Sequence, residues 1–342
     1  MTLTTPSPLG SSTAASAASA ASGASAASPA PGAAASATSD TQTTGLLAPI
    51  TIRTLQRWRL EGERFACLTC YDATTARWLE RAGVPVLLVG DTAAEVILGL
   101  PGTIHAPLDF LIQLTAAVKR GAPRAMVMAD MPFLSYQVSE AEGVRNAGRF
   151  MIEGLADTVK LEVDASFAPL VSQMSRAGIA VVAHIGSRPQ QTKRRGGYLS
   201  TGRTSADAAA LLDDAVALEQ AGAAIILVEA VPAEIAERIV SRVSVPVIGC
   251  GAGAACHGQV VVLQDLLGLS DWQPPFAQPL AHLGPSLLAA ASTWIDRVRT
   301  SNLGPHPYRI SPQELADVDR TRPPGGPGGH GGGTEGLPAR KP

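Results

Sequence analysis

Between residues 65 and 265, short and nearly continuous apolar runs alternate with longer segments whose apolar residues recur at helical spacing. Eight runs predict strands: FACLTC (65–70), VPVLLVG (84–90), RAMVMA (124–129), TVKLE (158–162), IAVVAHIG (179–186), AAIILVE (223–229), VSVPVIG (243–249) and QVVVLQ (259–264). The helices predicted among them include 72–82, 108–121, 139–154, 205–222 and 233–240. Apolar strands separated by helices indicate a parallel sheet that is buried on both faces.

The number of strand–helix units favours a closed barrel over an open sheet. Eight units in one domain fit a (β/α)8 TIM barrel, a fold of about 250 residues. An open nucleotide-binding sheet would place a glycine-rich turn after its first strand, and Tyr71-Asp72-Ala-Thr-Thr follows here instead. A last amphipathic helix is predicted over 282–301, where it either covers the barrel or docks on a neighbouring subunit.

Composition separates two tails from this barrel. Residues 1–44 are nearly all Ala, Ser, Thr, Gly and Pro, and the far end contains PPGGPGGHGGG. Small side chains bury too little apolar area to offset the entropy of an ordered chain. We therefore expect disordered tails at 1–44 and 303–342 around one catalytic domain at 45–302.

Charge and hydropathy point to a small-molecule partner. The chain has 27 Lys and Arg against 29 Asp and Glu, and its longest basic cluster is Lys193-Arg194-Arg195, which argues against nucleic acid. No apolar run approaches the roughly 18–20 residues of a spanning helix, so no membrane is expected. The N-terminal segment lacks the features of a secretory signal or transit peptide, and we expect a cytoplasmic protein.

Cys67 and Cys70 have the CxxC spacing of a zinc or redox site. They fall within a predicted strand, however, where residues three apart point to opposite faces. The pattern favours two packed side chains over a metal or redox pair.

Polar residues follow the strands at their carboxyl ends, which form the active-site face of a barrel. They are Asp72, Asp91, Asp130, Lys160 with Glu162, His184, Glu229, the glycine turn 249–253 and Asp265. Helix capping is the default explanation for Asp72 and Asp265. Asp91, Asp130 and Glu162 come from successive strands and offer three hard oxygens, which suits Mg²⁺. The alternative is an ion-pair network in which Lys160 only neutralises Asp130 or Glu162.

Glu229 and His184 are the candidates for proton transfer. Glu229 ends the run Ala-Ile-Ile-Leu-Val, where burial should raise its pKa toward neutrality, as in a general acid or base. A hydrogen-bonded structural glutamate is the alternative. His184 is equally compatible with a satisfied core histidine.

Eight segments together resemble one known family: LTCYDATTA, VLLVGDT, MVMADMPF, VKLE, VVAHIG, RGGYLSTGR, ILVEAVP and VPVIGCGAG. They occur in the order and spacing of the ketopantoate hydroxymethyltransferase (3-methyl-2-oxobutanoate hydroxymethyltransferase) family, over residues 50 to 282 or thereabouts. The resemblance implies a phosphoenolpyruvate/pyruvate-like (β/α)8 barrel that assembles as a homo-oligomer, a decamer.

The resemblance also implies a reaction. The hydroxymethyl group of 5,10-methylenetetrahydrofolate would be transferred to 3-methyl-2-oxobutanoate through a Mg²⁺-stabilised enolate, giving 2-dehydropantoate for pantothenate synthesis. Motif matching implies that Asp91, Asp130 and Glu162 hold Mg²⁺ and that Asp91, Thr92, Asp130 and Lys160 bind substrate. In the same way it implies that Glu229 is the general acid/base and that His184 supports it.

Several positions depart from the family pattern. Thr92 replaces a serine, Val163-Asp164 replaces Gly-Gly, and His257 and the stretch from Leu100 and Pro101 onward are also altered. A late basic motif reads Pro275-Phe276-Ala-Gln278. Two other classes therefore stay open: a paralogue with folate-independent aldol or lyase chemistry on another 2-oxo acid, and a catalytically silent structural or regulatory barrel.

Overall fold

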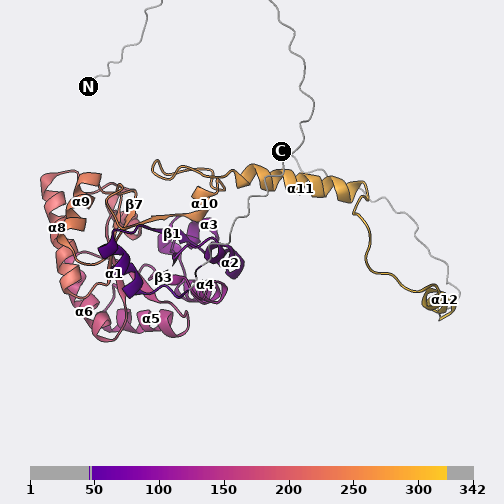
Figure 1. The fold of residues 1–342 in the computed structure, drawn as a ribbon, viewed down its shortest axis with the longest axis horizontal. Coiled ribbons are helices and arrows are strands. Elements are labelled where there is room, and N and C mark those ends of the chain that lie inside the picture. The colour runs from indigo at the N-terminus through magenta and orange to yellow at the C-terminus, as the bar shows by residue number, and fades with distance from the viewer. Residues whose placement is uncertain (1–45, 47, 322–342) are drawn as a thin grey trace, which may run out of the picture. The chain divides into compact units, whose positions relative to one another are not determined.

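The computed structural model describes residues 46 and 48–321, and its eight strands close into a single parallel barrel in sequence order (Figure 1). The strands are β1 (Phe65–Thr69), β2 (Val86–Val89), β3 (Met126–Asp130), β4 (Thr158–Glu162), β5 (Val181–Gly186), β6 (Ile225–Glu229), β7 (Val247–Cys250) and β8 (Gly258–Val261). β8 pairs with β1 and closes the ring. The predicted barrel is confirmed, with strand ends within a few residues of those expected.

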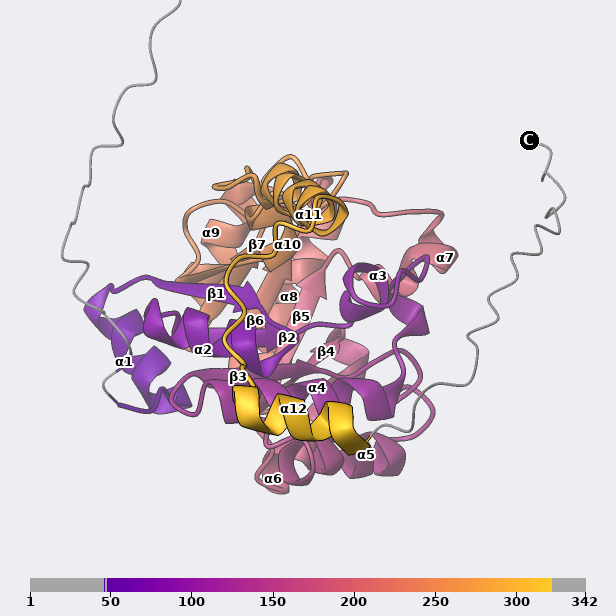
Figure 2. The ribbon, with the colours of Figure 1, turned by 90° about the vertical axis from the view of Figure 1, so that its right-hand side faces the viewer.

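Helices surround the strands (Figure 2). The longer ones are α1 (Ile52–Glu61), α2 (Ala73–Arg81), α4 (Leu108–Gly121), α5 (Glu140–Ile152), α6 (Ala168–Arg176), α8 (Ser205–Gln220), α9 (Ala233–Arg242), α11 (Leu283–Arg299) and α12 (Pro312–Thr321). Short turns of helix are α3 (Ala93–Val96), η1 (Thr103–His105), η2 (Ala165–Phe167), η3 (Pro189–Gln191), α7 (Thr192–Arg195) and α10 (Leu263–Leu266).

Helix α1 was not predicted, although its signals are local. Thr51 accepts the amide of Thr54 while the Thr54 hydroxyl accepts the amide of Thr51, and Gly62 ends the helix at φ +73°. Helix α12 lies inside the segment predicted as a tail at 303–342. The Ser311 hydroxyl accepts the Glu314 amide at its start, and Pro312 is its first residue. The predicted tail 1–44 and residues 322–342 lie outside the described residues.

The buried hydrophobic residues form two clusters, one inside the barrel and one between the strands and the surrounding helices, and alternate residues of a strand belong to different clusters. Cys67, Leu88, Met128 and Ile248 belong to one cluster inside the barrel, whereas Cys70 belongs to the cluster between strands and helices. All four cysteines are free. The expectation that Cys67 and Cys70 are packed side chains on opposite faces is confirmed.

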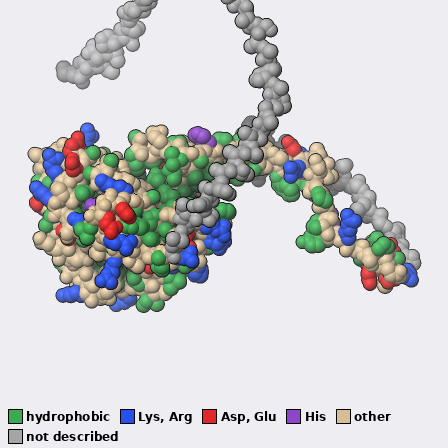
Figure 3. Space-filling view, viewed as in Figure 1, with side chains coloured by type: hydrophobic (Ala, Val, Ile, Leu, Met, Phe, Trp, Pro, Cys, Tyr) green, Lys and Arg blue, Asp and Glu red, His purple; other side chains and the backbone are tan. Residues whose placement is uncertain are grey.

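Figure 3 shows Lys and Arg side chains interspersed with Asp and Glu side chains on one face of the barrel, without a continuous basic patch. Within the part of the chain that the structure describes, no helix combines the length and apolar character needed to cross a bilayer.

Candidate active site

A cavity of about 710 Å³ opens at the carboxyl ends of the strands. It is lined by every predicted site residue: Asp91, Thr92, Asp130, Lys160, Glu162, His184 and Glu229. Asp72 is absent from its lining and caps α2 instead, accepting the amides of Thr74 and Thr75 at 2.8 Å. Asp265 lines the cavity from within α10, whose N-cap is Val262, so the capping explanation for Asp265 is wrong.

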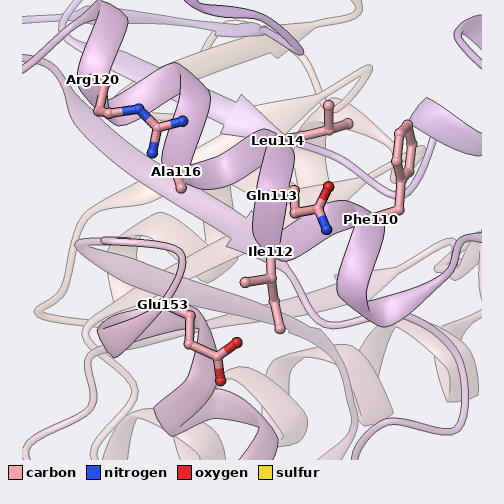
Figure 4. A pocket seen from close by; sticks show the side chains of 7 residues that line it. All are labelled: Phe110, Ile112, Gln113, Leu114, Ala116, Arg120 and Glu153. Atoms are coloured by element: carbon pink, nitrogen blue, oxygen red, sulfur yellow. The ribbon is translucent and has the colours of Figure 1, made fainter.

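A second cavity of about 470 Å³ lies over α4, with Glu153 at its edge (Figure 4). Its seven lining residues include neither a strand residue nor a buried charge. Of the two cavities, the one at the barrel mouth is therefore the one with buried charged side chains.

Gln190 in η3 ties together two of the buried carboxylates. Its side-chain amide donates to Asp91 Oδ2 at 2.9 Å, and its backbone amide donates to Glu162 Oε2 at 3.0 Å. Asp130 Oδ2 accepts the Asp91 backbone amide at 3.0 Å. These bonds fix the carboxylates that strands β2, β3 and β4 deliver to the mouth.

Lys160 is the buried cation of this group. Its ammonium lies 3.0 Å from Asp130 Oδ1. Burial favours the neutral amine, but the charges of Asp130, Asp91 and Glu162 outweigh it and raise the Lys160 pKa above its ordinary value. Lys160 is therefore a fixed positive charge that can bind an anionic substrate group.

Lys160 also sets the tautomer of His184. A lysine ammonium can only donate hydrogen bonds, so the Lys160 Nζ donates to His184 Nδ1 at 3.3 Å. Burial, followed by the Lys160 charge, lowers the His184 pKa well below its ordinary value, which keeps the ring neutral. Its proton must then be on Nε2, which lies 3.4 Å from Glu229 Oε2.

Glu229 ends this chain of contacts and faces the cavity. Burial raises its pKa to about 7, against the opposing charge of Lys160. The predicted rise in pKa is confirmed. Cys250, its register partner on β7, also lines the cavity. A carboxyl that titrates near neutrality beside an empty volume can take up and return a proton.

The carboxylates offer oxygen ligands but not a complete cage. Glu162 Oε1 is buried and has no hydrogen-bond partner in the described part of the chain, and burial together with the Asp91 charge raises the Glu162 pKa. Among residues 46 and 48–321, no group of three His, Cys, Asp or Glu side chains could hold a metal ion as they stand. The set fits a cation such as Mg²⁺, which binds through one or two carboxylates and completes its shell with water and substrate.

Of the altered family positions, Thr92 and Pro275 line the cavity, as does Thr103 in the stretch that begins at Leu100. Leu100, Pro101 and Gln278 do not line it. His257 precedes β8 and accepts the amide of Val247, the first residue of β7, so it lies at the opposite end of these strands. Leu100, Pro101, His257 and Gln278, which depart from the family pattern, are therefore outside the cavity lining.

Sequence reasoning missed Gln190, Tyr136 and Cys250. Tyr136 is buried, and its hydroxyl accepts the Glu162 amide at 3.0 Å. Gln190 follows the fifth strand closely in sequence, and this position at a carboxyl end was the available signal. Cys250 was visible as part of the turn after the seventh strand but was read only as glycine-turn backbone.

Solved structures with the same fold are distant in sequence. An oxaloacetate acetylhydrolase in complex with 3,3-difluorooxalacetate aligns with a TM-score of 0.51 at 16% identity, covering 79% of this chain and 94% of that one. A 2,3-dimethylmalate lyase of the PEP mutase/isocitrate lyase superfamily aligns with a TM-score of 0.50 at 17% identity, covering 79% and 91%. These likenesses establish the barrel type.

Sequence relatives are much closer. The 3-methyl-2-oxobutanoate hydroxymethyltransferase of Chloroflexus aurantiacus is 44% identical over 270 residues, which is 78% of this chain and 95% of that protein. The Hyperthermus butylicus enzyme of the same name is 42% identical over 250 residues, 73% and 86% respectively. The family model for ketopantoate hydroxymethyltransferase matches residues 49–305. The chain thus belongs to the ketopantoate hydroxymethyltransferase family, a family of enzymes that transfer a one-carbon unit.

Proposed function

We propose that the protein transfers a hydroxymethyl group from 5,10-methylenetetrahydrofolate to 3-methyl-2-oxobutanoate, giving 2-dehydropantoate. Relatives above 40% identity with this named activity support the proposal. The observation on which it chiefly depends is the chain of contacts from Asp130 through Lys160 and His184 to Glu229. It joins a fixed cation for a substrate carboxylate to a base whose pKa is about 7.

The chain's own residues would divide the work as follows. Lys160, with Thr92 at the cavity wall, binds and orients the oxo acid. Glu229 removes the C3 proton, and the neutral ring of His184 lies beside it, with Nε2 3.4 Å from Glu229 Oε2. Water opens the methylene bridge, breaking both of its carbon–nitrogen bonds and protonating the two nitrogens, which leaves formaldehyde and tetrahydrofolate. The C3 carbanion then adds to the carbonyl carbon of the formaldehyde, and the proton held by Glu229 goes to the former carbonyl oxygen, which becomes the hydroxyl.

Mg²⁺ is the cation that we propose for this site, with ligands drawn from Asp91, Asp130 and Glu162. When bound, it would polarise the ketone oxygen and so acidify C3. The orphaned Glu162 Oε1 and the all-oxygen donor set support this choice over Zn²⁺.

The test separates two half-reactions in the wild-type protein. With Mg²⁺ and 3-methyl-2-oxobutanoate in D₂O, loss of the C3 proton signal is followed by NMR; then methylenetetrahydrofolate is added and 2-dehydropantoate is measured. Both activities are expected. Exchange without transfer at saturating folate would instead support the folate-independent paralogue, and a folded, Mg²⁺-loaded protein with neither activity would contradict the enzyme reading for this substrate.

We also propose that the protein is a homo-oligomer, with the decamer of the family resemblance as the expected state. Strands β2 to β5 are buried throughout. Ala66 of β1 and Gln259 of β8, which pair with each other across the two strands, are exposed. The helix after β8, α10, has only four residues, and α11 has no buried residue at all. An apolar face of α11 and an uncovered barrel wall are both surfaces that a second copy would bury.

A further inference from the structure

The basic cluster Lys193-Arg194-Arg195 is placed beside the mouth of the cavity. It occupies three of the four residues of α7. The segments on both sides of α7 reach the cavity: Pro189 of η3 lines it before the helix, and Tyr198–Ser200 line it afterward. The turn through Gly196 at φ +78° brings the chain directly from the cluster back to the rim.

Nothing within the described chain neutralises this cluster. Arg188, earlier in the same segment, is paired with Asp164 at 2.6 Å, but the three cations of α7 have no ion pair among residues 46 and 48–321. Lys193 and Arg194 are exposed and Arg195 is half-buried. Burial and the repulsion of Arg188 and Arg194 lower the Arg195 pKa, so the cations already act on one another.

Helix capping does not account for the cluster. The amides of Gly196 and Gly197 both donate to the Thr192 carbonyl and so already close the end of α7. A four-residue helix also has little dipole for three cations to offset.

The remainder of the mouth has a different character. Among the residues that the structure describes, Lys160 is the one Lys or Arg that lines the cavity. Around the opening are the carboxylates Glu95 and Asp265 and the apolar side chains Trp272, Pro275 and Phe276. Consider a ligand whose flat ring enters this opening while a chain of carboxylates stays outside. The positive charges of α7 would attract those carboxylates, and the negative charge of Glu95 would repel them.

We propose that Lys193, Arg194 and Arg195 bind the anionic tail of the one-carbon carrier, namely the γ-linked glutamate carboxylates that extend from its pteridine portion. The inference rests on the proposed function, because it takes the carrier to be a folate. Exposed ion pairs contribute about 0.2–1 kcal/mol each. Three such pairs give a preference of about tenfold for a longer tail.

The experiment compares methylenetetrahydrofolate bearing one and five glutamates. The variant replaces Lys193, Arg194 and Arg195 together by Ser. A matched control removes the same charge at Arg53, Arg145 and Arg176, which are exposed on α1, α5 and α6. Wild type and control should have a KM about tenfold lower for the pentaglutamate, declining at high salt, and the α7 variant should lose this preference while keeping its kcat and C3 proton exchange.

Equal KM values for the two carriers in wild type, or a preference that survives in the α7 variant, would overturn the assignment. If wild type exchanges the C3 proton but transfers nothing from either carrier, the proposed function fails by itself. Binding of tetrahydropteroyl pentaglutamate, followed by tryptophan fluorescence, then decides the site: weaker binding in the α7 variant than in the control supports it, and no binding to wild type rejects it.

Discussion

Glu229 is the residue whose protonation should govern activity. Its pKa of about 7 lies within the working range, whereas His184 stays neutral because its own pKa is far lower. A base must be deprotonated, so the rate of C3 proton exchange should rise about tenfold from pH 6 to pH 8 and then level off. Glu229→Gln should remove both this dependence and at least about two orders of magnitude of rate. A pH profile that is flat in wild type, or unchanged in the variant relative to Glu237→Gln on the surface of α9, would contradict the assignment.

Gln190 should be essential to the arrangement of the carboxylates. Gln190→Ala leaves Asp91 Oδ2 without its side-chain donor in a buried site. The loss should lower the free energy of unfolding by about 1–3 kcal/mol and reduce exchange activity. Gln191→Ala, next in sequence and half-buried, loses no side-chain hydrogen bond to any residue among 46 and 48–321 and should change stability by less than about 0.5 kcal/mol. Urea denaturation of the two variants checks the difference, and equal stabilities would show that the Gln190 bridge contributes nothing.

Cys250 should be the reactive cysteine, although a slow one. It lines the cavity, whereas Cys67, Cys70 and Cys256 are buried. Burial and the neighbouring Glu229 raise its pKa well above the ordinary value, so little thiolate exists at neutral pH. Iodoacetamide should therefore modify Cys250 first, faster at higher pH, and more slowly when the oxo acid is bound. Peptide mass spectrometry identifies the site; first labelling at another cysteine would contradict this view of the cavity.

At the scale of elements, α2 and α4 approach so closely that one glycine is required. A Cβ on Gly121 would lie 2.4 Å from the Ala73 carbonyl oxygen and 2.7 Å from its Cα, both backbone atoms that cannot move aside alone. Gly121→Ala should therefore cost about 1–3 kcal/mol of stability. A Cβ on Gly148 within α5 would meet no described atom within 4 Å outside its chain neighbours and its own helix backbone, and Gly148→Ala should stabilise by about 0.5–1 kcal/mol. Thermal unfolding should thus shift in opposite directions, and a shift in the same direction would refute the close-packing argument.

At the scale of the whole molecule, the face of α11 formed by Leu287, Leu288, Trp294, Ile295 and Val298 should control assembly, since all five are exposed in one chain. Leu288→Asp with Ile295→Asp places two charges on that face. We expect light scattering to show a smaller species than wild type. Ala289→Asp, on the opposite side of the helix, should leave the mass unchanged. A monomeric wild type, or an unaltered oligomer in the double variant, would reject the proposed interface.

The sequence by itself determined the barrel and the residues at its mouth. Strand and helix periods are local properties, so TVKLE and 108–121 could be predicted with their observed bounds. Because parallel strands present their carboxyl ends on one face, the positions of Asp91, Asp130 and Glu229 also followed from the strands alone.

Tertiary structure decided how those residues are connected. Gln190 bridges carboxylates from β2 and β4 only because η3 folds back over the mouth, a loop conformation that periodicity does not encode. The His184 tautomer depends on Lys160 from the neighbouring strand, and its distance to Glu229 depends on the register of β5 and β6. His257 departs from the family pattern in sequence, and the return of the chain to the start of β8 places it at the end of the barrel opposite the mouth. Such contacts join residues far apart in sequence, and they exist only once the eight strands have closed.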